Sequence, residues 1–172
     1  MRAALGLLLA VCVLAPVGAR AQDAASGTGM QPVSFAQWDV VLESHHGAIV
    51  VVDYWASWCP PCIERFPHMV EMHHRYHDRG VRFISLNLDE QGDTEALDWC
   101  NGFLARVGAE FPNYHLDENM STAFERLDLL GLPVVRIFAP DGNEAYKLTG
   151  DNPYEQFTEK DVENAILELL AR

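Results

Sequence analysis

Residues 48–62 read AIVVVDYWASWCPPC and carry the clearest structural signal in the chain. The first part, Ala48–Trp55, is a nearly continuous run of β-branched and aromatic residues, which is typical of a central strand covered by helices on both faces. The CPPC pattern at 59–62 follows, and proline is tolerated in the first turn of a helix because the N–H groups there have no intrahelical acceptor. The stretch therefore predicts a buried strand that leads into a helix, with two cysteines at the junction.

The two cysteines of this junction are suited to reversible disulfide chemistry. With two residues between them, Cys59 and Cys62 can close and reopen a small disulfide ring. Cys59 is expected at the helix N-terminus, where free N–H groups and the helix dipole stabilise a thiolate and lower the thiol pKa from about 8.5. The thiolate is the attacking species, so we expect Cys59 to be the nucleophile and Cys62 the shielded, resolving thiol.

A purely structural disulfide and half of a zinc site are the alternatives for this pattern. Zinc needs two more ligands at suitable spacing, and the chain contains no second C-x-x-C and no Cys/His pair with ligand spacing. Cys100 lies on an amphipathic stretch and is expected to be a buried, inert thiol. The redox interpretation is therefore favoured, with the disulfide itself as the redox group and no metal or organic cofactor.

The remaining sequence predicts alternating strands and helices. Strands are expected at 48–55, 81–88, 134–138 and 144–149, with a short extended piece at 112–116. Helices are expected from Ser34 to about residue 46, at 60–78, 94–107 and 120–130, and from Thr158 onward. A βαβα order followed by ββα implies a mixed sheet flanked by helices.

The amino terminus carries a predicted export signal. One basic residue, Arg2, precedes an apolar run at 3–17, and the small-residue pattern ARA follows at 19–21. This is typical of a secretory signal peptide that is cleaved after the ARA pattern. An uncleaved anchor would need about 20 apolar residues, and lipidation of Cys12 would call for a small residue where Val11 stands. We therefore expect an exported, periplasmic protein.

Length and charge set further limits. The 172 residues amount to one domain, so we expect a signal peptide at 1–21, a flexible tail at 22–33 and a single domain at 34–172. Without residues 1–21 the chain keeps 10 basic and 25 acidic residues, a net charge of −15. Such a negative charge disfavours binding to the phosphate backbone of a nucleic acid, so nucleic acid is not an expected partner.

Three features in register make the chain resemble a known family. The WCPPC segment at 58–62 is similar to a W-C-x-P-C motif, Pro67 to a helix-kinking proline five residues after the second cysteine, and the GLP segment at 131–133 to a cis-proline loop before a strand. These features resemble the thioredoxin superfamily, and more closely its exported TlpA/ResA-like thiol:disulfide oxidoreductases. The 71 residues from Cys62 to Pro133 leave room for the extra helix and strand of that group, at about 93–117.

The resemblance implies an α/β fold, namely a thioredoxin-like three-layer α/β/α sandwich with a central mixed sheet and a TlpA-like insertion. It implies a protein-disulfide oxidoreductase that exchanges disulfides with partner proteins, as a reductant. A membrane or thioredoxin-type electron donor would recharge it, and its substrates would include apocytochrome c or a copper-site protein. We expect a monomer. The alternatives are a disulfide oxidase or isomerase, and a copper-binding accessory protein.

The resemblance also assigns two carboxylates. Asp53 stands six residues before Cys59, at the position of a buried acid whose raised pKa lets it shuttle the proton of Cys62. The alternative is an aspartate satisfied by hydrogen bonds at the strand edge. Glu90 matches an acidic position near the disulfide of ResA-like proteins; its neighbour Asp89 is also acidic, and a solvated loop acid is the alternative.

Candidate substrate contacts come from the same resemblance. A cis peptide bond at Pro133 would place the backbone of Leu132 beside the Cys59 sulfur, as an edge to which an extended substrate segment can pair. Trp58 is expected at the rim of the site. The candidate substrate contacts are Trp58, Pro60, Leu132 and Pro133.

A histidine-rich helix face supports the copper alternative. His73 and His77 are four residues apart and could share a soft metal ion. His68, His74, Met69 and Met72 lie on the same stretch. Solvated surface histidines are much more common than metal ligands, so no metal site is predicted.

Overall fold

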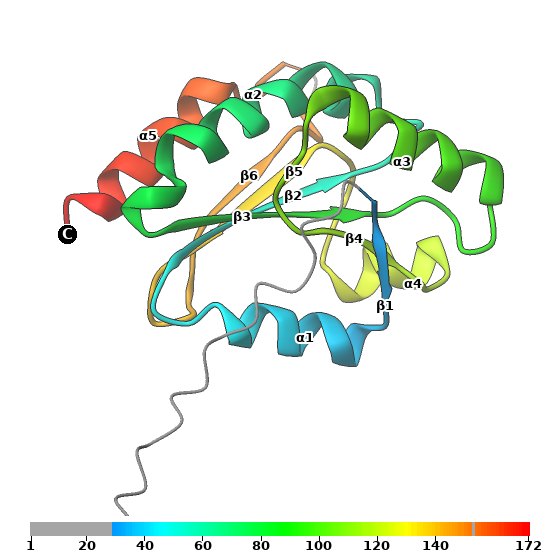
Figure 1. The fold of residues 1–172 in the computed structure, drawn as a ribbon, viewed down its shortest axis with the longest axis horizontal. Helices are drawn as coiled ribbons and strands as arrows, with labels where there is room; N and C mark the ends of the chain where they lie inside the picture. Colours follow the sequence, from blue (N-terminus) through cyan, green and yellow to red (C-terminus); the bar gives the residue numbers. More distant parts are fainter. Residues whose placement is uncertain (1–28, 153) are drawn as a thin grey trace, which may run out of the picture.

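A computed structural model describes residues 29–152 and 154–172. The predicted signal peptide at 1–21 and most of the predicted tail lie outside the described residues. A single six-stranded sheet is enclosed between two layers of helices (Figure 1). In the part of the chain that is described, no helix has both the length and the apolar character needed to cross a membrane.

The sheet is mixed, as predicted. Its strands are β1 (Gln31–Val33), β2 (Ile49–Trp55), β3 (Val81–Asn87), β4 (Asn113–Leu116), β5 (Val134–Phe138) and β6 (Glu144–Thr149). They lie in the order β1-β4-β3-β2-β5-β6. The strands β1, β4, β3 and β2 run parallel to one another, whereas β5 pairs antiparallel with both β2 and β6. β2 is therefore a central strand.

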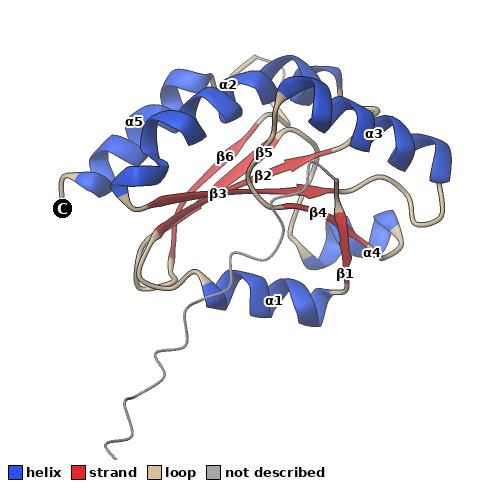
Figure 2. Ribbon diagram, in the orientation of Figure 1, coloured by secondary structure: helices blue, strands red, loops and turns tan. Residues whose placement is uncertain are grey.

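Two helical layers cover the sheet, as Figure 2 shows. The helices are α1 (Phe35–Ser44), α2 (Pro60–Tyr76), α3 (Thr94–Val107), α4 (Met120–Arg126) and α5 (Glu159–Leu170), with a 3₁₀ turn at His77–Arg79. α2, α3 and α5 pack on one face, and α1 and α4 on the other. The α/β/α sandwich is confirmed, and α3 with β4 forms the predicted extra helix and strand.

The sheet begins inside the segment that the sequence predicts to be a tail. Gln31–Val33 forms the edge strand β1 and pairs with β4, Gln31 opposite Tyr114 and Val33 opposite Leu116. Pro32 fits an edge strand because a proline has no N–H to donate to a neighbour. The last three residues of the segment predicted as a tail at 22–33 therefore lie in a strand, and Met30 before them donates its N–H to Oδ1 of Asn101 at 2.8 Å.

The alternation of side chains along β2 places one carboxylate in the core. Val51 and Trp55 belong to the core layer beneath α2, α3 and α5, while Val50 and Tyr54 belong to the layer beneath α1 and α4. Successive side chains of a strand point to opposite faces. Asp53 therefore faces α2, the helix that follows the two cysteines.

Candidate active site

The two cysteines of the CPPC pattern are joined at the start of α2. Cys59 is the N-cap residue of the helix, directly before Pro60. It forms a disulfide bond with Cys62, and the two Cα atoms are 5.3 Å apart. The oxidised pair is buried, with relative exposures of 3 % for Cys59 and none for Cys62. The predicted disulfide at a helix N-terminus is confirmed.

A buried ion pair lies on the face of β2 that α2 covers. Nη2 of Arg65 donates to Oδ1 of Asp53 at 3.1 Å. Burial raises the pKa of Asp53 to about 6, and the charge and hydrogen bond of Arg65 oppose this rise. Arg65 is absent from the sequence-based prediction. Its spacing of three residues from Cys62, on the same helix face, is the signal that could have found it.

A second buried carboxylate holds the loop in front of the cysteines. Asp89 is 2 % exposed and accepts hydrogen bonds from the backbone N–H and the hydroxyl of Ser57, at 2.9 and 2.6 Å. The amide of Asn87 donates to it at 2.7 Å and the thiol of Cys100 at 3.4 Å. Ser57 is two residues before Cys59, so Asp89 fixes the approach to the nucleophile.

The neighbouring acid, Glu90, faces a different element. Its carboxylate accepts hydrogen bonds from the side-chain amide of Asn119 at 3.1 Å and from the backbone N–H of Met120 at 3.2 Å. Both donors belong to the N-terminal end of α4. Of the two adjacent acids, Asp89 bonds next to the cysteine motif and Glu90 caps a helix. A catalytic role for Glu90 stays a prediction.

The loop before β5 has the expected backbone form. The peptide bond between Leu132 and Pro133 is cis. The N–H of Gly150 donates to the carbonyl of Pro133 at 2.8 Å. A Cβ on Gly150 would lie 2.7 Å from Cδ of Pro133, so the two backbones approach closely because residue 150 has no side chain. Leu132 is partly buried and packs against the core layer that contains both cysteines.

Two tryptophans flank the motif in different environments. Trp55 is fully buried, whereas Trp58 is 50 % exposed and stacks on Phe124 of α4 with ring centroids 6.2 Å apart. Pro60 is exposed beside it. The exposed surface next to the disulfide is therefore aromatic and apolar, and Phe124 is a member of it that the sequence did not indicate.

The histidine-rich face of α2 forms no metal centre within the described residues. The rings of His73 and His77 are 5.2 Å apart between centroids. Burial lowers the pKa of His73, and the nearby histidines lower it further. Across residues 29–152 and 154–172, no group of three or more His, Cys, Asp or Glu side chains is arranged to hold a metal ion.

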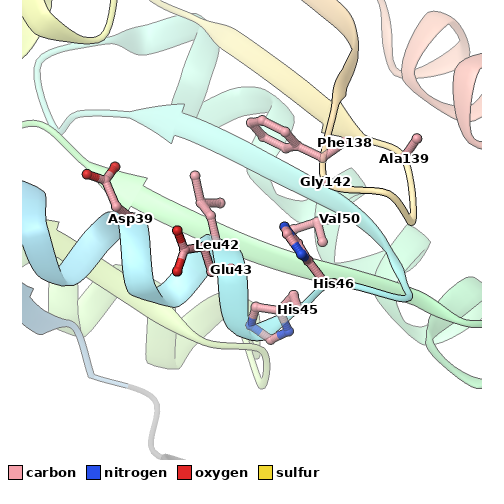
Figure 3. A pocket seen from close by; sticks show the side chains of 9 residues that line it. All are labelled: Asp39, Leu42, Glu43, His45, His46, Val50, Phe138, Ala139 and Gly142. Carbon is pink, nitrogen blue, oxygen red and sulfur yellow. The ribbon is translucent and has the colours of Figure 1, made fainter.

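A surface pocket of about 380 Å³ lies away from the disulfide (Figure 3). It is formed by the end of α1 and the turn between β5 and β6, next to Val50 near the start of β2. Cys59 follows the other end of β2. His46 points into this pocket against Gly142 (Figure 3). The pocket is therefore not part of the disulfide site.

Comparison with known proteins identifies the family. Residues 17–166 match the family model described as Redoxin. The chain belongs to the Redoxin family. Among curated relatives of this Redoxin chain, a thiol-disulfide oxidoreductase ResA from Bacillus thuringiensis is 26 % identical over 120 residues, which is 70 % of this chain and 65 % of that protein. The chain thus spans less than two thirds of the length of these curated relatives, and only 48 % of a ResA protein from Halalkalibacterium halodurans.

Solved structures agree with this assignment. The Redoxin chain superimposes with a TM-score of 0.60 on a putative thiol:disulfide interchange protein DsbE from Chlorobium tepidum, at 29 % identity, covering 75 % of this chain and 84 % of that one. A thiol-disulfide isomerase from Corynebacterium glutamicum gives a TM-score of 0.61 at 18 % identity, and the match covers 76 % of this chain and 85 % of that one. The latter shows the fold alone. The resemblance to the ResA-like group of the thioredoxin superfamily is confirmed.

Proposed function

We propose that the protein is a thiol:disulfide oxidoreductase that exchanges disulfides with partner proteins. The observation that supports this most strongly is the Cys59–Cys62 disulfide at the N-terminus of α2. Free N–H groups and the positive end of the helix dipole stabilise a thiolate on Cys59 once the bond is reduced. Disulfide-containing proteins are then its substrates, and the cysteines themselves carry the electrons.

In the reductive direction the exchange has two steps. The Cys59 thiolate attacks a substrate disulfide, so that a mixed disulfide forms and one substrate sulfur leaves as a thiolate. The Cys62 thiol then loses its proton and attacks the Cys59 sulfur. The Cys59–Cys62 bond forms, the bond to the substrate breaks, and the second substrate sulfur leaves. Two electrons pass to the substrate, and its two thiolates take up protons from solvent or from the protein.

Asp53 is the proposed acceptor of the Cys62 proton. It faces α2 from the buried strand β2, and its pKa of about 6 makes it a carboxylate at neutral pH. A carboxylate with a pKa near the working pH is suited to take up a proton and return it.

The exposed aromatic and apolar surface beside the disulfide is the proposed docking site for substrate. Trp58 and Pro60 lie on the motif itself, and the loop at Leu132 and Pro133 offers a backbone edge to an extended segment. Cys59 itself is only 3 % exposed in the oxidised protein, so this adjacent surface is the part of the site that a partner protein can contact.

We place the protein outside the cytoplasm, in the periplasm, as a reductant fed by a membrane or thioredoxin-type electron donor. The signal-peptide pattern before Gln22 supports this location. Reduction of apocytochrome c or of a copper-site protein is the proposed use. Expression of the full chain in a bacterium, followed by fractionation and N-terminal sequencing, tests the location. We expect a periplasmic protein that begins at Gln22.

Two cysteine variants test the mechanism. Cys59→Ser is expected to abolish reduction of insulin disulfides, because it removes the nucleophile. Cys62→Ser is expected to accumulate mixed disulfides with insulin, because the resolving thiol is gone; non-reducing electrophoresis detects them. Equal, partial losses in both variants would contradict the assigned roles.

The direction of electron flow follows from the reduction potential of the Cys59/Cys62 pair. Equilibration of the protein with glutathione or dithiothreitol mixtures measures it. A value near about −270 mV, as in thioredoxin, supports a reductant, whereas a value near about −120 mV, as in DsbA, would make the protein an oxidant. The latter outcome would replace the proposed direction with the oxidase alternative.

A further inference from the structure

The ion pair between Arg65 and Asp53 lies beneath the same buried face of α2 as Cys62. Arg65 is three residues beyond Cys62 on α2, so both side chains are on the helix face that packs on β2. The side chains of Arg65 and Asp53 are 6 % and 1 % exposed, and Nη2 and Oδ1 are 3.1 Å apart. A cation therefore lies buried beside the carboxylate that the proposed function uses as a base.

The pair is joined through one oxygen of the carboxylate. Oδ2 of Asp53 is buried, and it accepts no hydrogen bond from the residues that the structure describes. Nε and Nη1 of Arg65 are likewise buried without such a partner. A pair that served stability alone would gain from two parallel hydrogen bonds, because a bidentate contact offsets more of the desolvation cost. The single contact leaves Oδ2 open to a proton.

The aromatic ring of Phe157 lies against the guanidinium group of Arg65. Cζ of Arg65 lies 4.1 Å from the centroid of the Phe157 ring. Phe157 precedes α5 and packs against the core layer that contains both cysteines. A cation over an aromatic face is attracted by the ring, and this replaces part of the hydration that burial removes. Phe157 thus holds Arg65 in place against Asp53.

Among the described residues, Arg65 is the charged group that acts on Asp53. Its partners across the sheet are Ser85 on β3 and Val135 on β5, and both are uncharged. Arg65 supplies the charge and the hydrogen bond that lower the pKa of Asp53, against the rise caused by burial. Without Arg65, burial would keep Asp53 protonated through neutral pH.

We propose that Arg65 is a positioning residue for the exchange reaction: it holds Asp53 as a carboxylate beneath α2, with Oδ2 free to take the proton of the Cys62 thiol. This inference rests on the proposed function, in which Asp53 is the base for Cys62. In the resolving step the proton passes from the Cys62 sulfur to Asp53, while the Cys59–Cys62 bond forms and the Cys59–substrate bond breaks.

A single-turnover assay of the reduced protein with 5,5′-dithiobis(2-nitrobenzoate) separates the two steps. The first thionitrobenzoate is released as the mixed disulfide forms on Cys59, and the second as Cys62 displaces the remaining group. The rate of each release is measured by stopped flow as a function of pH. The first release reports the nucleophile and the second reports the proton transfer from Cys62.

Arg65→Met and Arg65→Lys test the positioning role. Arg65→Met removes the cation, so the pH midpoint of the second release is expected to rise by about two units, which slows that step about tenfold at pH 7. The first release should keep its rate. Arg65→Lys keeps the charge and is expected to restore the midpoint to within about half a unit. Arg65→Gln, which is neutral but can donate a hydrogen bond, replaces Arg65→Met if that variant does not fold.

Variants of Asp53 distinguish failure of this inference from failure of the proposed function. If Asp53→Asn slows the second release but neither neutral Arg65 variant moves its midpoint, the role of Arg65 is overturned and Asp53 remains the base. If Asp53→Asn leaves the second release unchanged, both proposals about this pair fall. The double variant Asp53→Asn/Arg65→Met should show the same pH dependence of the second release as Asp53→Asn alone. A further shift of the pH midpoint would mean that Arg65 acts on the Cys62 thiol directly and would overturn the proposal.

Discussion

Ser57 and Asp89 are joined by two hydrogen bonds, from the backbone N–H and from the hydroxyl of Ser57, at 2.9 and 2.6 Å. Ser57 follows β2 and Asp89 follows β3, so the bonds connect the loops at the carboxyl ends of two neighbouring parallel strands. Both bonds involve a charged acceptor, which makes them stronger than bonds between neutral groups. The position of Cys59 is therefore tied to β3 as well as to β2.

Replacing Asp89 should destabilise the protein. Asp89→Ala leaves the N–H of Ser57 and the amide of Asn87 without their acceptor in a buried position. We expect the free energy of unfolding of the oxidised protein to fall by about 2 to 4 kcal/mol, because buried donors lose their partners. Urea denaturation followed by circular dichroism measures the change.

Glu90→Ala is the matched control for this prediction. Glu90 is adjacent in sequence and only partly buried, and its bonds go to the start of α4. We expect a loss of no more than about 1 kcal/mol, the usual size of a cap contribution. Similar losses for Asp89→Ala and Glu90→Ala would contradict the special role of the Ser57–Asp89 contact.

Local patterns account for the parts of the fold that the sequence predicts well. The strands at Val134–Phe138 and Glu144–Thr149 agree with their predicted limits, because the turn residues between them define both ends. The edge strand Gln31–Val33 is different. It has three residues and owes its conformation to pairing with β4, more than 80 positions later in the chain. No local pattern marks such a strand.

The candidate site divides in the same way. The disulfide pair and the cis peptide bond at Pro133 follow short motifs, and the sequence predicts both. Arg65 and Asp89 act through contacts with Asp53 and Ser57 on other elements. Sequence spacing in a loop does not show which of two adjacent acids turns inward. The family resemblance points to Glu90, and the structure shows that its neighbour Asp89 is the acid bonded to Ser57 beside the motif.

Stability should depend on pH through Asp53. Its pKa rises from the ordinary 3.8 to about 6 in the folded protein, so the folded state binds the proton more tightly than the unfolded state. The stabilisation is fully present below pH 4 and is lost as the pH rises through about 6. The loss amounts to about 3 kcal/mol, at 1.36 kcal/mol per pKa unit.

The double variant Asp53→Asn/Arg65→Met isolates this contribution. It removes both buried charges together, so neither is left unpaired. We expect its stability relative to the wild-type protein to rise by about 3 kcal/mol between pH 4 and pH 7, as measured by urea denaturation at each pH. A stability difference that does not change with pH would rule out a raised pKa at Asp53.

Substrate docking should depend on Trp58. Trp58→Ala removes an exposed ring that stacks on Phe124 beside the disulfide, so we expect the KM for insulin to rise several-fold with little change in the thermal midpoint. Trp99→Ala is the control, because Trp99 is 42 % exposed and stacks on Phe103 within α3. An equal rise of KM in both variants would show a general effect of losing a surface tryptophan.

Cys100 should take no part in turnover. Its thiol is fully buried and donates to Asp89 at 3.4 Å, and burial together with the nearby negative charge raises its pKa, so the reactive thiolate does not form at neutral pH. We expect Cys100→Ser to reduce insulin disulfides at a rate within about twofold of the wild-type rate, because the serine hydroxyl can donate to the same carboxylate. Thiol titration of the oxidised wild-type protein should find no reactive group in the native state and one after denaturation, apart from any thiol in residues 1–28. A tenfold loss of turnover in Cys100→Ser, or rapid labelling of Cys100 in the folded protein, would instead identify it as a third redox thiol.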